Sequence, residues 1–185
     1  MILSLKKVAV MTAIISLLGV VATYGLKALT FEEIASPVEE ETTYGPIKLT
    51  ATLDKSVYRL GENVNVTLRI TNIDNKTIRL SFATPIKVDF AVYDESLQLI
   101  YVDSFTYGTI FITSSVALEP EESLVRTLQW GQQKIVGGNY SKLEPVNLGT
   151  YFISGQTGPG YILVKPYDQE IEKIETPKIQ IAITR

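Results

Sequence analysis

The clearest alternation of apolar and polar residues along the chain lies at positions 63–70. Every second residue from Val64 to Ile70 is apolar, and the residues between them are polar. Because successive side chains of a strand point to opposite faces, this period of two predicts a β-strand with one buried face and one solvated face. Gly61 precedes this segment, and the polar residues 72–75 that follow it favour a turn.

The same kind of pattern recurs at short, regular spacing after residue 46. Further strands are expected at 47–54, 77–82, 87–92, 98–105, 110–118, 123–130, 150–154, 161–165 and 178–184. Turn-forming residues separate these segments, and no helical period appears beyond Leu29. The pattern predicts an all-β domain, namely an antiparallel immunoglobulin-like β-sandwich. A closed barrel would produce the same succession of strands, and the sequence leaves that alternative open.

The N-terminal segment has a different character. Lys6 and Lys7 precede residues 8–26, which carry no charged side chain. As a helix this run would span roughly 28 Å, close to the thickness of about 30 Å of a bilayer's hydrocarbon core. The basic flank before it and the glutamates after it predict a single transmembrane helix with the C-terminal domain outside the cytoplasm. The alternative is a cleaved signal peptide, whose apolar region is usually shorter, at about 7–15 residues.

By composition the chain divides into three parts. Residues 1–29 form the membrane anchor or signal peptide, residues 30–46 are rich in glutamate, and residues 47–185 contain the predicted strands. Clustered charge without apolar periodicity is typical of a solvated linker, so we expect residues 30–46 to be an acidic stalk. Both interpretations of the N-terminal segment place the sandwich at the cell membrane or in the secreted fraction.

Charge and residue usage narrow the function classes. The chain has 17 basic and 20 acidic side chains and contains neither histidine nor cysteine. This near-balanced charge predicts no nucleic-acid partner. The missing residue types exclude thiol nucleophiles, disulfides and the commonest general base. No spacing of serine with lysine, or of paired carboxylates, stands out, so we expect a protein that is not an enzyme and needs no cofactor.

A calcium site is the one metal site that the acidic residues suggest. Asp89, Asp94, Glu95 and Asp103 could gather on one face or edge of a sheet. The chain lacks the Asp-x-Asp-x-Asp loop typical of calcium sites, and charged residues on an outer face explain the four carboxylates more simply. We therefore expect no metal.

Four motifs accompany the strand pattern. They are Gly61-Glu62 with the strand at 64–72, Asp-Phe-Ala-Val-Tyr-Asp at 89–94, Leu-Glu-Pro-Glu-Glu-Ser-Leu at 118–124, and Trp130 with Gly-Thr-Tyr at 149–151. Together they resemble the BsuPI (intracellular proteinase inhibitor) domain family over about residues 48–155, with Glu121 where the family usually has Gly. The resemblance implies an immunoglobulin-like sandwich and a protease as partner.

Candidate glycosylation sites follow from three Asn-x-Ser/Thr triplets, which begin at Asn65, Asn75 and Asn139. The alternation puts Asn65 on the solvated face of its strand, while the other two fall in predicted loops. Exposure of this kind is what modification of these asparagines requires.

Candidate binding residues lie in three predicted loops, because loops displayed by a rigid scaffold usually carry the binding contacts. The loops are 105–109, 137–140 and the glycine-rich 155–161, and the residues singled out are Tyr107, Gly155, Gly158, Gly160 and Tyr161. No lysine or helix follows the glycines, so they are not expected to form a phosphate-binding loop.

These features favour an extracytoplasmic, membrane-anchored β-sandwich that binds a protein partner and acts in the manner of a proteinase inhibitor. The alternative is a structural subunit of a cell-surface layer or filament that self-associates by strand addition. In that case residues 30–52 would complete the sheet of a neighbouring copy. The many glutamates of this tail would be costly to bury, which favours the first function.

Overall fold

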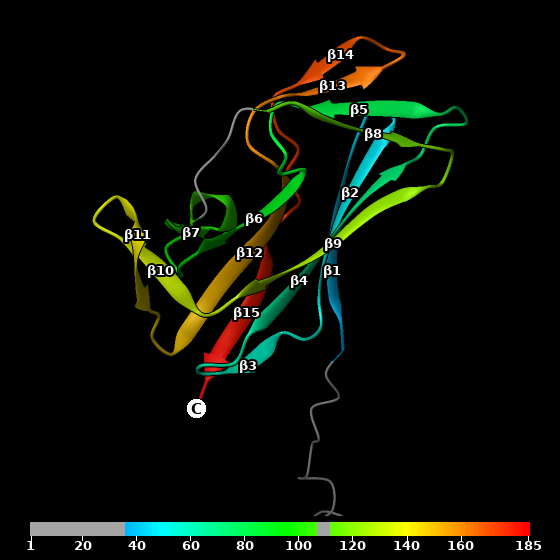
Figure 1. Cartoon of the computed structure of the whole chain (residues 1–185). Coiled ribbons are helices and arrows are strands. Elements are labelled where there is room, and N and C mark those ends of the chain that lie inside the picture. The colour runs from blue at the N-terminus through cyan, green and yellow to red at the C-terminus, as the bar shows by residue number, and fades with distance from the viewer. Residues whose placement is uncertain (1–35, 107–111) are drawn as a thin grey trace, which may run out of the picture. The chain divides into compact units, whose positions relative to one another are not determined.

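Figure 1 shows the computed structural model, which describes residues 36–106 and 112–185. These residues form strands and one short 3-10 helix, so the predicted all-β class is confirmed. The helix predicted within residues 1–29 lies outside the described residues. No helix in the described ranges is long and apolar enough to cross a membrane.

The strands form three sheets, of four, five and four strands, and a two-stranded hairpin, and all three sheets contribute side chains to one core. The first sheet has the spatial order β1 (Val38–Tyr44), β2 (Ile47–Leu53), β4 (Val64–Asn72), β9 (Ser123–Trp130). The second has the order β3 (Val57–Arg59), β15 (Ile179–Thr184), β12 (Gly149–Thr157), β6 (Val88–Tyr93), β7 (Leu99–Val102). The third, drawn uppermost in Figure 1, has the order β14 (Gln169–Ile171), β13 (Ile162–Lys165), β5 (Ile78–Phe82), β8 (Ser114–Leu118). The hairpin consists of β10 (Gln133–Val136) and β11 (Asn139–Pro145). The short 3-10 helix is η1 (Asp103–Thr106).

The pairing between strands is antiparallel, with one exception at an edge. Strand β3 runs parallel to β15, with Val57 opposite Ala182. Within the described residues, β1 and β9 border the first sheet, and β3 and β7 border the second. Both sheets therefore stay open, and the domain is a sandwich rather than the closed barrel that the sequence left as an alternative.

The apolar face of β4 lies at the centre of the core. Val64, Val66, Leu68 and Ile70 are fully buried, whereas Arg69 between them is exposed. The neighbouring β2 repeats this arrangement along residues 47–53. These side chains join one buried cluster with residues of β6, β12 and β15. The face that the alternation predicts to be buried is therefore the face that packs against the second sheet.

A buried asparagine ties together the two turns that lead from the first sheet to the third. The Asn72 amide donates to the carbonyl oxygens of Lys76 at 2.8 Å and Leu118 at 2.9 Å, and its oxygen accepts from the Asp74 N–H at 2.9 Å. The Glu121 N–H donates to the Asn72 carbonyl at 3.0 Å. Glu121 has a φ of 64°, in the left-handed region that favours glycine. The backbone at residue 121 therefore adopts a conformation that favours glycine although the residue is glutamate.

The structure differs from the prediction in the segment 30–46. Its residues Val38–Tyr44 form β1, which pairs with β2 from Val38 opposite Leu53 to Tyr44 opposite Ile47. The glutamates that suggest a solvated stalk line the edge of the sheet, where Glu39 accepts a hydrogen bond from Thr52 and Glu41 pairs with Lys48. Because β1 and β2 already pair within one chain, assembly by donating this tail would require an exchange between copies.

Gly155 corrects a second expectation, because it lies in β12 opposite Phe90 and not in a loop. A Cβ atom at this position would lie 2.6 Å from Leu68 Cδ2 and 2.8 Å from Ala51 Cβ. The two sheets approach each other so closely here that only a glycine fits without a shift of its neighbours. In the sequence a strand glycine of this kind looks like a loop glycine, because the contact that requires it comes from another strand.

We expect Gly155→Ala to destabilise the domain by about 1–3 kcal/mol, since overpacking of a core forces side chains and backbone apart. Ala51→Gly in the same protein should recover part of that loss, because it removes the Cβ that the new methyl group meets. Urea denaturation of both single variants and the double variant measures the coupling. Arg69→Ala, on the solvated face, is the control and should change stability by less than about 0.5 kcal/mol. Additive effects would show that the two sheets are not in contact at this point.

Candidate functional site

The glycine-rich connection between β12 and β13 is shorter than predicted and is packed against the domain. It consists of residues 158–161. The Gly158 N–H donates to the Lys87 carbonyl at 3.0 Å, and a Cβ at Gly158 would collide with the carbonyl of Ile86. Gly160 has a φ of 87° and lies so close to Ala83 that a Cβ would approach its methyl group to 2.7 Å. Both glycines therefore allow close contact with the β5–β6 connection, and the loop has a fixed conformation.

Gly158 and Gly160 line a cavity of about 220 Å³ beside strand β6. Asp89 of β6, Ser104 of η1 and Gln156 of β12 contribute polar groups to its wall. Phe105, and Glu172 and Lys173 from the β14–β15 connection, also line it. The structure thus brings two of the predicted glycines to one hollow but excludes Gly155 from it.

Asp89 is the most deeply buried carboxylate of this wall, with only 2% of its surface exposed. Its Oδ1 accepts from the N–H groups of Phe90 at 2.8 Å and Ser104 at 3.1 Å, and its Oδ2 accepts from Gln156 Nε2 at 3.2 Å. Burial raises the pKa of Asp89, and these hydrogen bonds oppose the rise by stabilising the charged form. The carboxylate therefore joins β6, η1 and β12 in one hydrogen-bonded unit.

A cavity with these polar groups in its wall can bind a small polar group. The hydroxyl of Ser104 is buried beside the Asp89 carboxylate, where it opposes the rise in the pKa of Asp89 that burial causes, although within the described residues no acceptor lies at full hydrogen-bond geometry to it. A water molecule or a small donor group in the cavity would satisfy it, as buried polar groups normally require. In the described residues no group of three or more acidic side chains is close enough to hold a metal ion.

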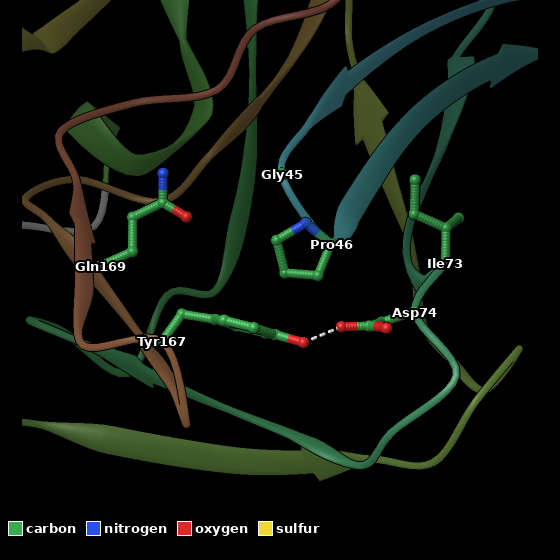
Figure 2. Close-up of a pocket in the computed structure, with 6 residues that line it drawn as sticks. All are labelled: Gly45, Pro46, Ile73, Asp74, Tyr167 and Gln169. Atoms are coloured by element: carbon green, nitrogen blue, oxygen red, sulfur yellow. Dashed lines mark hydrogen bonds between the residues drawn. The ribbon is translucent and has the colours of Figure 1, made fainter.

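A second hollow, of about 670 Å³, lies where three turns meet (Figure 2). Gly45 and Pro46 come from the β1–β2 turn, and Ile73 and Asp74 from the β4–β5 turn. Tyr167, before β14, points across the hollow and donates a hydrogen bond to the Asp74 carboxylate. This bond lowers the pKa of Asp74 and raises that of Tyr167. The hollow is open to solvent and presents apolar and aromatic surface next to one carboxylate.

The other predicted binding residues are dispersed. Tyr161 is 45% exposed and follows the packed glycines. Tyr107 lies outside the described residues, as does most of the loop 105–109. The predicted loop 137–140 is shorter in the structure: Gly137 and Gly138, both with a positive φ, form the tip of the β10–β11 hairpin, whereas residues 139–140 belong to β11. The three predicted loops therefore do not form one common site within the described residues.

The predicted glycosylation sites have different environments. Asn65 lies within β4, is half-buried, and its oxygen accepts a hydrogen bond from Gln129 at 3.0 Å. Asn75 is exposed in the β4–β5 turn. Asn139 begins β11, and its side chain is outside what the structure describes. Of the two described side chains, that of Asn75 has the exposure that modification needs.

Sequence reasoning considered Asp89 only as one of four possible calcium ligands. It missed the role of Asp89 as a buried hydrogen-bond acceptor in the cavity wall, because the alternation placed it on the polar face of its strand. In the structure the side chains on both faces of β6 are buried from Val88 to Val92, and the Ser104 N–H of η1 donates to Asp89. A carboxylate within a strand of otherwise apolar and aromatic residues was the available signal. A buried carboxylate must be hydrogen-bonded, so its presence implies donors on neighbouring elements.

Comparison with known proteins gives one family match. The model of the family described as intracellular proteinase inhibitor, BsuPI, matches residues 51–151, which is more than half of the chain. The matched region begins within β2 and ends within β12. It therefore includes the first sheet from β2 onward and the strand that carries Asp89. A search of curated proteins found no match.

Several solved structures are distantly similar. A β-glucosidase from Listeria innocua in complex with glucose has a TM-score of 0.38 and 11% identity over 82% of this chain. The C-terminal domain of wzt has a TM-score of 0.42 and 8% identity, covering 82% of this chain and 81% of that domain. The ApaA protein from Bordetella pertussis has a TM-score of 0.36 and 12% identity, covering 82% and 93%. The chain spans only 16% of the length of the β-glucosidase, and likenesses this distant carry no functional argument.

The raised pKa of Asp89 predicts how stability depends on pH. The folded state binds the Asp89 proton more tightly than the unfolded state does. The stabilisation that follows from this difference is fully present below the ordinary pKa of 3.8. The contribution is lost as the pH rises through the higher pKa of the folded state. The variant Asp89→Asn has an amide that does not titrate but has nearly the same size and shape as the carboxyl group. The unfolding free energy of the wild type minus that of Asp89→Asn should therefore decrease from about pH 4 to pH 7.

Urea denaturation of both proteins at stepped pH values measures this difference. All other titrating groups are common to the two proteins, so the difference isolates Asp89. A difference that stays constant or increases with pH would contradict the burial of the charged carboxylate.

Proposed function

Because this chain belongs to the intracellular proteinase inhibitor (BsuPI) family, we propose that it is a proteinase-inhibitor-like binding module that catalyses no reaction. The observation that carries the proposal is the family match over residues 51–151, which includes the central strands of the sandwich. The partner is a proteinase, recognised through the surface of the folded domain.

Rigidity of the displayed loops supports this function. Protease–inhibitor interfaces usually form with little backbone movement, and loops that are ordered beforehand avoid the entropic cost of being fixed on binding. The connections at both ends of β6 meet this requirement. Gly158 and Gly160 are packed against the β5–β6 connection, and the Asp94 carboxylate orders the β6–β7 turn through hydrogen bonds to two N–H groups.

We further propose that the domain acts outside the cytoplasm, attached to the membrane by residues 1–29. The support is the uncharged run 8–26 behind Lys6 and Lys7, with its glutamate-rich continuation. The family description refers to an intracellular inhibitor, so this chain would present the same domain in another compartment.

Inhibition can be tested with the purified protein and a panel of proteinases from the serine, cysteine, aspartic and metallo classes. We expect stoichiometric loss of peptide hydrolysis by at least one of them, because protease–inhibitor complexes are among the tightest known. Mass spectrometry of the chain after incubation is the control, since an inhibitor remains intact and a competing substrate is cleaved. Full proteinase activity throughout the panel, together with degradation of the chain, would contradict the proposed function.

Membrane attachment can be tested on the native protein. We expect the protein to remain with membranes after washing with high salt or carbonate and to keep the residues before Leu26, since the apolar run is long enough to span a bilayer. Extraction followed by N-terminal mass spectrometry measures both properties. A soluble form that begins near Thr23 or Leu26 would instead indicate a cleaved signal peptide.

A further inference from the structure

Four hydrogen bonds hold the exposed turn between β6 and β7. The Asp94 Oδ1 accepts from the N–H groups of Ser96 and Gln98, both at 2.9 Å. The backbone adds a bond from the Leu97 N–H to the Asp94 carbonyl at 2.9 Å and one from the Asp94 N–H to the Gln98 carbonyl at 3.0 Å. Four hydrogen bonds within residues 94–98 therefore fix the position of the side chain at the tip.

The side chain at this tip is a leucine in a conformation that leucine rarely adopts. Leu97 has a φ of 59°, and its surface is 56% exposed. A bulky residue at positive φ is strained, and glycine or asparagine normally occupies such a position. Burial does not compensate for the strain, since more than half of the side chain faces solvent. Neither stability nor solubility accounts for a leucine here.

The β3–β4 turn shows the ordinary solution within the same molecule. Leu60 there is equally exposed, at 53%, but the left-handed conformation is taken by the adjacent Gly61, with a φ of 84°. The other non-glycine residues at positive φ make contacts within the chain. For example, the Gln132 side chain bonds the Gly61 N–H and the Arg59 carbonyl, both at 2.8 Å. Leu97 differs from Glu121, Gln132 and Asp168 because, among the described non-glycine residues at positive φ, it has the one apolar side chain.

Further apolar surface and two carboxylates lie beside Leu97. Leu99, two residues along in β7, is 53% exposed. The beginning of β12 adjoins the turn, because Phe152 of β12 pairs with Tyr93 at the end of β6. Burial raises the pKa of the neighbouring Tyr151, and the negative charges of Asp94 and Glu95 add to this rise. The tip is therefore an apolar projection with an acidic border.

We propose that the β6–β7 hairpin is the element that contacts the proteinase, with the Leu97 side chain filling an apolar pocket of the enzyme. This inference rests on the proposed inhibitory function. The partner that fits is a proteinase whose main specificity pocket is apolar and is bordered by basic residues opposite Asp94 and Glu95. Residues held in sparsely populated backbone conformations cluster at functional sites, so the conformation of Leu97 supports a contact of this kind. Leucine supplies the apolar surface, and the four hydrogen bonds keep it in place before binding.

The test measures inhibition constants of the full-length protein against chymotrypsin, which has an apolar pocket, and trypsin, whose pocket contains an aspartate. We expect the wild type to inhibit chymotrypsin more strongly than trypsin. Leu97→Gly should raise the inhibition constant at least about tenfold, as loss of a buried anchor does. Leu97→Asn should raise the inhibition constant to a similar extent, since asparagine, like glycine, tolerates a positive φ.

Leu60→Gly is the matched control, an equally exposed leucine in another turn, and should leave the inhibition constant within about twofold. The melting temperature of Leu97→Gly should equal or exceed that of the wild type, which separates lost contact from lost folding. Equal inhibition constants for the wild type and Leu97→Gly, or stronger inhibition of trypsin, would overturn the inference and leave the inhibitory function standing. If the wild type inhibits neither chymotrypsin nor trypsin and no proteinase of the four-class panel, the proposed function fails, and this inference fails with it.

Discussion

The close contact between strands β4 and β12 is the constraint on which the rest of the domain depends. The Leu68 side chain and the Ala51 methyl group pack against the bare backbone of Gly155, at a point where no Cβ would fit. This contact fixes the distance between the two sheets. It thereby also positions β6 and β15, which pair with β12 on either side. The buried apolar area of both sheets forms one continuous core around it.

Sheets packed this closely leave polar backbone groups at their ends that cannot reach water. Buried side chains satisfy them, as the energetics of buried polar groups require. Asn72 bonds the turns at one end of the first sheet, and Asp89 bonds β6 to η1 and β12 in the second sheet. These side chains also hold the connecting segments in place. Asn72 and Asp89 therefore hold the segments that they bond, whereas the β6–β7 turn is held by the carboxylate of Asp94 within the turn itself.

The β6–β7 hairpin gives this rigidity a consequence for function. Its backbone is fixed by four hydrogen bonds, whereas its apolar side chain is directed to solvent. In most of the domain, local preference, burial and hydrogen bonding favour the same conformation. At Leu97 they do not, and such a disagreement is expected where a residue serves contact with a partner rather than folding. The membership of the inhibitor family and this local feature therefore support the same mode of action by surface contact.

The sequence by itself determined the strands whose two faces differ in polarity, such as β4 and β2, and the face of each that is buried. It also determined the family, through motifs within residues 51–151. Only the tertiary structure decided the role of Gly155, the pairing of the acidic residues of β1 with β2, and the burial of Asp89. The reason is physical: alternation of polarity reflects the two faces of a single strand, whereas these three features depend on strands that are distant in sequence.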